Sequence, residues 1–448
     1  MPKIDILEHD LTRVTAAIGT DIPYIPGFAG QDVSNYTAEP ILCTSVLQFE
    51  KFFGTKPAVF TTGSSKPEYE IDNYSVDRSY IMARELLALG MPVYYHAILK
   101  PGDAQKFDEA NLYEQLIKRF SDESIFNTSN IRDKGAYTIK YITTGGYANY
   151  GIKDAAGAVL SKLIADIAAK RGDAVAFIED VPRAASLDPT SANSFFNKLK
   201  TDTTTLTDEN ESFAAAFTAW GEYKLSKTYR ILDGEGNVKK IETALLPGCY
   251  AYLACLAINM KLGPNWLAMA GTTRGLIPNL IKLHVPANQQ LNNMVADAYQ
   301  PTEPDTADGS RALNAITDIK PYGLCVWGNR TLRAITEEQP LAGTSFLNIR
   351  NMVSDIKKVA YRVAKTLIYE QNTELLWIKF RAEISPFLDQ LVSGAGIADY
   401  KLLKLDTRYD GTELGKEEFA CAIKIYPIYA VEAFEVTIVI TDADVEVQ

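Results

Sequence analysis

The sequence is poor in the residues that build reactive centres. Its three histidines, His9, His96 and His284, lie far apart and do not form the paired spacing of a metal-binding helix. Its five cysteines are scattered without a CxxC pair, which favours buried free thiols in a reducing compartment over a disulfide or zinc framework. Neither a GxSxG nor a GxxxxGK[ST] motif is present. We therefore expect no cofactor, no metal and no enzyme activity.

Long apolar runs and an excess of basic charge are also absent. No apolar stretch approaches the roughly 20 residues that cross a bilayer, and MPKIDILEHD lacks the apolar core of a secretory signal. We expect that the chain is synthesised in a cytosol and does not insert into a membrane. The net charge of −11 argues against nucleic-acid binding by the bulk surface. The 448 residues, 47% hydrophobic and 23% charged, predict a folded protein of two or three domains.

The strongest helical pattern lies near the end of the chain, over residues 346–370. Repetition at about 3.6 residues gives this segment one apolar face, made of Ile349, Met352, Val353, Ile356, Val359, Ala360, Val363 and Leu367. The opposite arc is basic and contains Arg350, Lys357, Lys358, Arg362 and Lys365. Such a face is either solvated or meets an acidic partner.

Residues 36–330 alternate between strand and helix patterns, which predicts an α/β fold. The apolar run AVAFIEDVP, at 174–182, is typical of a parallel strand buried on both faces. A helix is expected from about residue 75 to 89, ending at Gly90. Prolines and glycines in PYIPGFAG, at 23–30, predict irregular structure.

A carboxylate pair, Glu179 and Asp180, ends that apolar strand, at a position where α/β enzymes often place catalytic groups. The position favours a structural role for the pair, such as capping or pairing with a nearby arginine. A cytosolic α/β enzyme that uses this strand end remains an alternative, and it predicts activity lost on Asp180→Ala.

Both ends of the chain contain a strand-like segment without a neighbouring partner. These are KIDILEHDL at 3–11 and FEVTIVIT at 434–441. A lone strand is not stable in water, and an exposed apolar edge promotes aggregation. Each segment must therefore pair with another part of the fold or with another chain.

Several segments, taken in order, resemble one family. They are SVLQFEKFFG, AAKRGDAVAFIEDVP, LPGCYAYLACLAINMKLGPNWLAMAGTTRG, NAITDIKPYGLCVWGNRTL and FLNIRNMVSDI. Their succession is similar to that of the tail sheath proteins of contractile phage tails and related injection machines. The most specific part is the signature of Trp327, Gly328, Arg330, Thr331 and Leu332. The chain departs from the family at Asn351, where a second arginine is common, and in EQNTELLWIKF, which lacks a usual Phe-x-x-Asn pattern.

The resemblance implies a structural, non-enzymatic subunit. Such subunits polymerise as stacked hexameric rings around an inner tail tube and contract to drive the tube through a target cell envelope. The implied partners are other copies, the tube protein, and the baseplate and tail terminator proteins, in a virion tail assembled in the bacterial host cytoplasm. The sheath of a phage-tail-like bacteriocin or of an extracellular contractile injection system is an alternative.

The resemblance also implies a multidomain fold of α/β and α+β parts. We expect an N-terminal arm (1–35) that joins the C-terminal domain, an outer α/β part (36–145), a central α/β domain (146–325), and a C-terminal α+β domain (326–448). Strand exchange between subunits would use Ile4, Asp5, Ile6 and Leu7 and, at the other end, Val436, Thr437, Ile438, Val439 and Ile440. The tube would meet the basic helix face of Arg350, Lys357, Lys358, Arg362 and Lys365.

Overall fold

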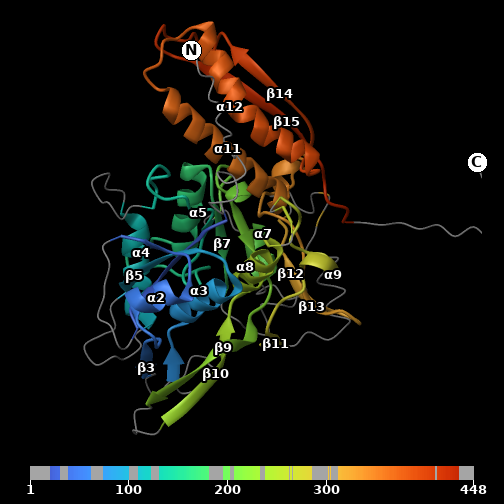
Figure 1. Ribbon diagram of the computed structural model, residues 1–448. Helices are drawn as coiled ribbons and strands as arrows, with labels where there is room; N and C mark the ends of the chain where they lie inside the picture. The colour runs from blue at the N-terminus through green and yellow to red at the C-terminus, as the bar shows by residue number, and fades with distance from the viewer. Residues whose placement is uncertain are drawn as a thin grey trace, which may run out of the picture.

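The computed structural model describes residues 21–30, 39–61, 74–99, 109–122, 131–180, 195–201, 206–232, 238–261, 263–264, 266–284, 301, 303, 311–408 and 411–432. In these residues an α/β body carries a smaller C-terminal domain of helices and strands (Figure 1). The predicted combination of α/β and α+β parts is confirmed. No described helix is both long and apolar enough to cross a membrane.

A six-stranded sheet forms the centre of the α/β body, in the order β2-β5-β1-β6-β7-β8. The edge strand β2 runs antiparallel to β5, and the other pairs are parallel. The strands are β1 (Pro23–Phe28), β2 (Ile41–Cys43), β5 (Val93–Leu99), β6 (Tyr141–Ile142), β7 (Val175–Ile178) and β8 (Ala214–Ala216). Every residue of β7 is buried, as its apolar run predicts for a strand covered on both faces.

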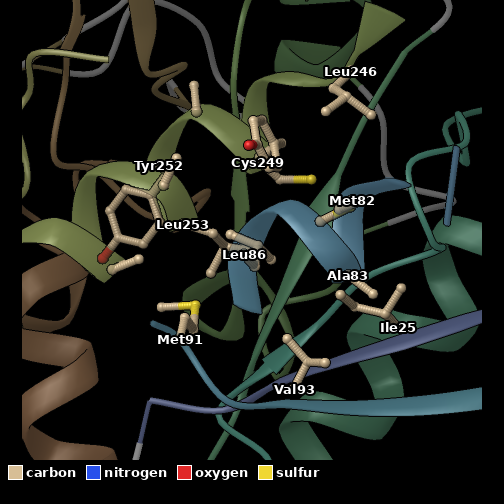
Figure 2. Packing of buried hydrophobic residues seen from close by; sticks show 14 of the residues in the cluster. Ile25, Met82, Ala83, Leu86, Met91, Val93, Leu246, Cys249, Tyr252 and Leu253 are labelled. Carbon is tan, nitrogen blue, oxygen red and sulfur yellow. The ribbon is translucent and has the colours of Figure 1, made fainter. Parts of the chain in front are cut away.

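Helices cover both faces of this sheet and form a core on each. On one side Ile25 and Val93 contribute to a core with α2 (Val46–Phe53), α3 (Arg78–Leu89) and α8 (Gly248–Asn259). Figure 2 shows Met82 and Leu86 of α3 in this core, beside Leu253 of α8. On the other side Tyr24 lies in a core with α4 (Glu109–Ser121), α5 (Leu160–Arg171) and α7 (Phe195–Thr201).

The prediction that residues 23–30 are irregular is wrong, because β1 is an inner strand of the sheet. It pairs in parallel with β5 on one side and β6 on the other, with a register irregularity at Gly27/Phe28. Pro23 is the first residue of the strand, a position that tolerates proline. A side chain at Gly27 would clash with Ser79 and Tyr95. Neighbouring strands, which a local pattern does not contain, therefore determine this element.

The predicted boundaries after residues 35 and 145 divide one compact unit. The central sheet takes β1 from the predicted arm, β2, β5 and β6 from the predicted outer part, and β7 and β8 from the predicted central domain. The boundary after residue 325 also cuts β13 (Gly323–Trp327), which forms a hairpin with β12 (Ala315–Ile319). Parallel strands come together from distant parts of a chain, so segment boundaries in the sequence do not mark domains here.

Two further groups of strands extend the α/β body. A hairpin of β9 (Gly221–Leu232) and β10 (Val238–Leu246) pairs through β9 with β11 (Leu280–Leu283), and it projects away from the C-terminal domain (Figure 1). The strands β3 (Val59–Thr61) and β4 (Tyr74–Val76) pair with each other in antiparallel orientation. The helix α9 (Gly271–Arg274) precedes β11.

The C-terminal domain consists of α11 (Leu347–Leu367), α12 (Glu374–Ser393) and a hairpin of β14 (Ile397–Leu405) and β15 (Ala420–Pro427). The predicted apolar face of α11 is confirmed, because four of its eight residues are buried in the core of this domain and the other four pack against that core while partly buried. The same core takes Phe380, Ile384, Leu388 and Leu391 from α12. Figure 1 shows α11 running out of the α/β body into this domain.

Candidate assembly site

Buried ion pairs hold the first half of α11 against the α/β body. The Lys140 ammonium, at the start of β6, lies 2.6 Å from Asp21 Oδ1 and 2.7 Å from Asp355 Oδ2 on α11. All three residues are at most 5% exposed. Burial alone would lower the pKa of Lys140, but the two carboxylates outweigh it and raise that pKa above its ordinary value. Lys140 is therefore charged, and it joins α11 to the segment that leads into β1.

The ion pairs of Lys140 with Asp21 and Asp355 form a joint between α11 and the α/β body. Near this joint, the predicted tube-facing surface is wrong at two positions. Arg350 and Lys358 are 5% and 6% exposed, so neither lies on an exposed helix face along which a tube could pack. Desolvation lowers the pKa of Lys358 to about 8 and that of Arg350 to about 10. A helical wheel predicts one buried face, whereas the first half of α11 packs against two surfaces. Lys357, Arg362 and Lys365 are exposed, and for these residues the tube contact stays a prediction.

The signature residues connect β13 to the start of α11. A Cβ at Gly328 would lie 2.7 Å from Asn314 Cα, so this position accepts only glycine without a shift. The backbone N–H of Arg330 donates to Asn314 Oδ1 at 2.7 Å, and the Asn329 carbonyl accepts from the N–H of Leu347 at 2.9 Å. Thr331 Oγ1 donates to the Thr344 carbonyl at 2.8 Å. These contacts fix where α11 begins.

Packing accounts for the other two signature residues. Leu332 is fully buried in the core between the sheet and α4, α5 and α7, and Trp327 packs against that core while partly buried. The signature therefore stabilises the α/β body at the same place where it positions α11.

Arg330 also binds Glu432, the last residue that the structure describes. Its Nε lies 3.0 Å from Glu432 Oε2, and its guanidinium lies 4.5 Å from the centre of the Phe346 ring. The Tyr429 ring packs edge-on against the Phe346 ring, with ring centres 5.2 Å apart. The sequence gives no signal for this ion pair, because its partners are 102 positions apart.

The C-terminal sheet is small and open in the described residues, where it has only the strands β14 and β15. Its inner face packs on α11 and α12 through partly buried residues such as Leu402, Ile423 and Ile425. On its outer face the exposed Lys401 and Lys424 lie directly opposite one another. The predicted strand-exchange residues at 4–7 and 436–440 lie outside the described residues. Described contacts nevertheless place Asp21 and Glu432, which adjoin the two terminal segments, beside α11 and Phe346.

Glu179 has a structural role in this arrangement. Its Oε1 accepts a hydrogen bond of 2.7 Å from the N–H of Cys249 in the first turn of α8. The residue is 2% exposed, and burial raises the pKa of its carboxyl to about 8. The carbonyl of Asp180 accepts from Trp220 Nε1 at 2.8 Å. The carboxylate thus caps a helix and packs inside the body, as the structural interpretation predicts.

No family model matches the chain. It is 22% identical over 228 residues to the tail sheath protein of Vibrio phage KVP40, a match that covers 50% of this chain and 31% of that protein. The matched relative is therefore much longer than the region it shares with this chain. The predicted sequence resemblance to tail sheath proteins is confirmed.

Solved structures match over nearly the whole chain. A protein in the contracted baseplate of the anti-feeding prophage has a TM-score of 0.61 and 15% identity, with 99% of each chain covered. The contracted sheath complex of an extracellular contractile injection system has a TM-score of 0.54 and 15% identity, covering 99% of this chain and 98% of that one. The chain therefore has the fold of these proteins.

Proposed function

The chain has the fold of contractile sheath proteins, and we propose that it is the structural, non-enzymatic subunit of such a sheath. The observation that carries this proposal is the match over 99% of the chain to the sheath complex of an extracellular contractile injection system, together with the sequence match to a phage tail sheath protein. Copies would stack as hexameric rings around an inner tail tube and contract to drive the tube through a cell envelope. The partners would be other copies, the tube protein, and baseplate and terminator proteins.

The open C-terminal sheet supports assembly through strand addition. In the part of the chain that the structure describes, two strands on two helices leave main-chain donors and acceptors at both edges, and sheets of this size gain stability from a third strand. Strand addition supplies affinity through main-chain hydrogen bonds and register through alternate side chains. The segments at 4–7 and 436–440 have the alternating apolar pattern for this role. The adjoining residues, Asp21 and Glu432, make contacts around the base of the C-terminal domain.

The exposed end of α11 supports a contact with the tube. Arg362 and Lys365 are exposed on the part of the helix that extends beyond the buried joint. Contacts of this kind with an acidic surface are individually weak and screened by salt. Weak contacts suit a sheath that must release the tube surface during contraction.

The setting of the machine stays open between a phage tail in a virion and a phage-tail-like bacteriocin or extracellular injection system. The sequence match is to a phage protein and the structural matches are to injection systems. The proposed role of the sheath subunit is the same in each of these settings. The cytosolic enzyme alternative gains no support, because the Glu179 carboxylate caps α8 inside the body.

Negative-stain microscopy of the purified chain tests the proposal. We expect hollow tubes from the full chain and their loss on deletion of residues 1–15, which leaves the described fold untouched. A matched control replaces the same 15 residues by a Gly/Ser sequence of equal length, and it should also fail to assemble. Uniform monomers or dimers from the full chain would contradict the proposed function.

A further inference from the structure

Two cations lie over the Phe213 ring, where α11 meets the α/β body, and a third cation lies near Arg350. The Arg350 guanidinium lies 4.2 Å from the ring centre and the Lys357 ammonium lies 5.4 Å from it. Arg333, from the segment after the signature, is close enough to Arg350 to lower its pKa further. We call these residues, with Ser212, the Phe213 site.

The cations of the Phe213 site have no carboxylate partner among the described residues. Arg350 Nη2 donates to Ser212 Oγ at 2.6 Å, while its buried Nε makes no hydrogen bond. Arg333 donates only to neutral oxygens, the Pro340 carbonyl at 3.1 Å and Ser345 Oγ at 3.2 Å. Buried guanidinium groups are normally paired, because desolvation of an unpaired charge is costly. The site therefore lacks a carboxylate in the part of the chain that the structure describes.

The acidic groups nearest to the site are already engaged. Asp173, which interacts with Lys357 at longer range, pairs with Arg171 at 2.9 Å. Glu211, next to Ser212, pairs with Arg311 at 2.6 Å and also accepts from the N–H of Ala334 at 2.7 Å. Neither carboxylate can turn to the Phe213 site without leaving another buried cation unpaired.

Arg330 shows what completes a site of this kind. It lies on the same segment as Arg333 and also stacks on a phenylalanine, but its guanidinium is paired with the Glu432 carboxylate. A carboxylate at the Phe213 site would accept hydrogen bonds from free guanidinium N–H groups in the same way. The site is open to such a group, since Lys357 is exposed and Ser212, Phe213 and Arg333 are partly exposed.

We propose that the Phe213 site receives an aspartate or glutamate side chain from a second copy of this chain. Charge complementarity points to this occupant, because the chain has 56 acidic and 45 basic residues, so a second copy brings an excess of carboxylates to a site rich in cations. The inference rests on the proposed function, since only an assembly of copies brings a second chain to the site. It assigns Arg350 and Lys357 to contacts between subunits and leaves Arg362 and Lys365 for the tube.

Zero-length cross-linking tests the proposal directly. A carbodiimide joins a lysine amine to a carboxylate in contact with it, and assembly from an equal mixture of 15N-labelled and unlabelled chains marks bonds between copies. We expect Lys357 to form mixed-isotope cross-links to an aspartate or glutamate in assembled tubes and none in dispersed chains. The control Lys357→Arg keeps the charge, so tubes should persist while this cross-link is lost.

An Arg350→Met variant separates this role from a structural one. If Arg350 awaits a partner's carboxylate, its removal leaves the Tm of dispersed chains unchanged or raised. The concentration needed for tube formation should then rise by about ten-fold or more. Lys365→Met, on the same helix but outside the site, should change neither quantity.

The outcomes distinguish this inference from the proposed function. Wild-type tubes that lack mixed-isotope cross-links at Lys357 overturn the inference and leave the sheath function standing. A lowered Tm for Arg350→Met with an unchanged assembly concentration also overturns it. Same-isotope cross-links alone would assign the carboxylate to the same chain and overturn it as well. Absence of wild-type tubes overturns both proposals.

Discussion

The two sheets of this molecule differ in how much of their structure a single chain supplies. The central sheet has six strands, helices on both faces, and strand residues such as Tyr24, Ile25 and Phe177 that are fully buried. The described C-terminal sheet has two strands, and no residue of β15 is fully buried. In the C-terminal domain, Tyr369 in the turn after α11 and Ile378 on α12 are 100% and 56% exposed. Helices of the same subunit cover both faces of the first sheet, whereas the second is the sheet that the proposed strand exchange would complete.

Hydrogen exchange should show this contrast most strongly. In dispersed chains we expect the amides of β14 and β15 to exchange far faster than those of β1 and β7, because protection follows burial and ladder hydrogen bonds on both sides. In assembled tubes the amides of β14 and β15 should become protected while those of β1 change little. Equal protection of the two sheets in dispersed chains would contradict the comparison.

The joint between the two regions should be sensitive to loss of one lysine. Lys140→Ala leaves Asp21 and Asp355 as neighbouring buried carboxylates, which should lower the free energy of unfolding by about 3–5 kcal/mol. Urea denaturation followed by circular dichroism measures the loss. The exposed Lys56→Ala is the control and should stay within about 0.5 kcal/mol of the wild type. A small effect of Lys140→Ala would mean that the buried charges do not hold the joint.

Local patterns predicted the elements whose environment is repetitive. The apolar face of α11 follows from a period of 3.6 residues, and β7 follows from a continuous apolar run. The helix α3 ends at Leu89 as expected, because Gly90 adopts a left-handed conformation with φ of 94°. Each of these signals lies within a dozen residues or so of the element it specifies.

Long-range contacts explain what the sequence did not predict. Burial of Arg350 and Lys358 depends on surfaces contributed by the α/β body, which a helical wheel does not contain. The role of Arg330 depends on Glu432, and that of β1 on β5 and β6. The strand β14 was missed because its segment, IADYKLLKL, mixes lysines with apolar residues on a surface that is only half covered.

Replacement of the buried Lys358 should have a smaller effect on the free energy of unfolding, and this effect should depend on pH. Its pKa is about 8 in the folded chain and about 10.4 when unfolded, so between these values the unfolded chain binds more protons. The free energy of unfolding of the wild type should therefore rise as the pH increases from about 8 to about 10. At pH 7 we expect Lys358→Met to be more stable by roughly 1–3 kcal/mol, with the difference shrinking toward pH 10.

Urea denaturation at pH 7 and pH 10 measures this difference. Lys365→Met, an exposed change on the same helix, should show no such pH dependence. A Lys358→Met variant that is less stable than the wild type at both pH values would show that the ammonium stabilises the joint.

The smallest effect is expected on the open sheet itself. Lys401 and Lys424 are opposite one another and exposed, and like charges in this position destabilise a strand pair. Lys424→Glu replaces the repulsion by an attraction and should stabilise the C-terminal domain by about 0.2–1 kcal/mol. The double change of Lys401→Glu with Lys424→Glu restores a like-charged pair, so the gain should disappear. If the two single changes are instead additive in thermal unfolding, the lysines do not interact across the strands.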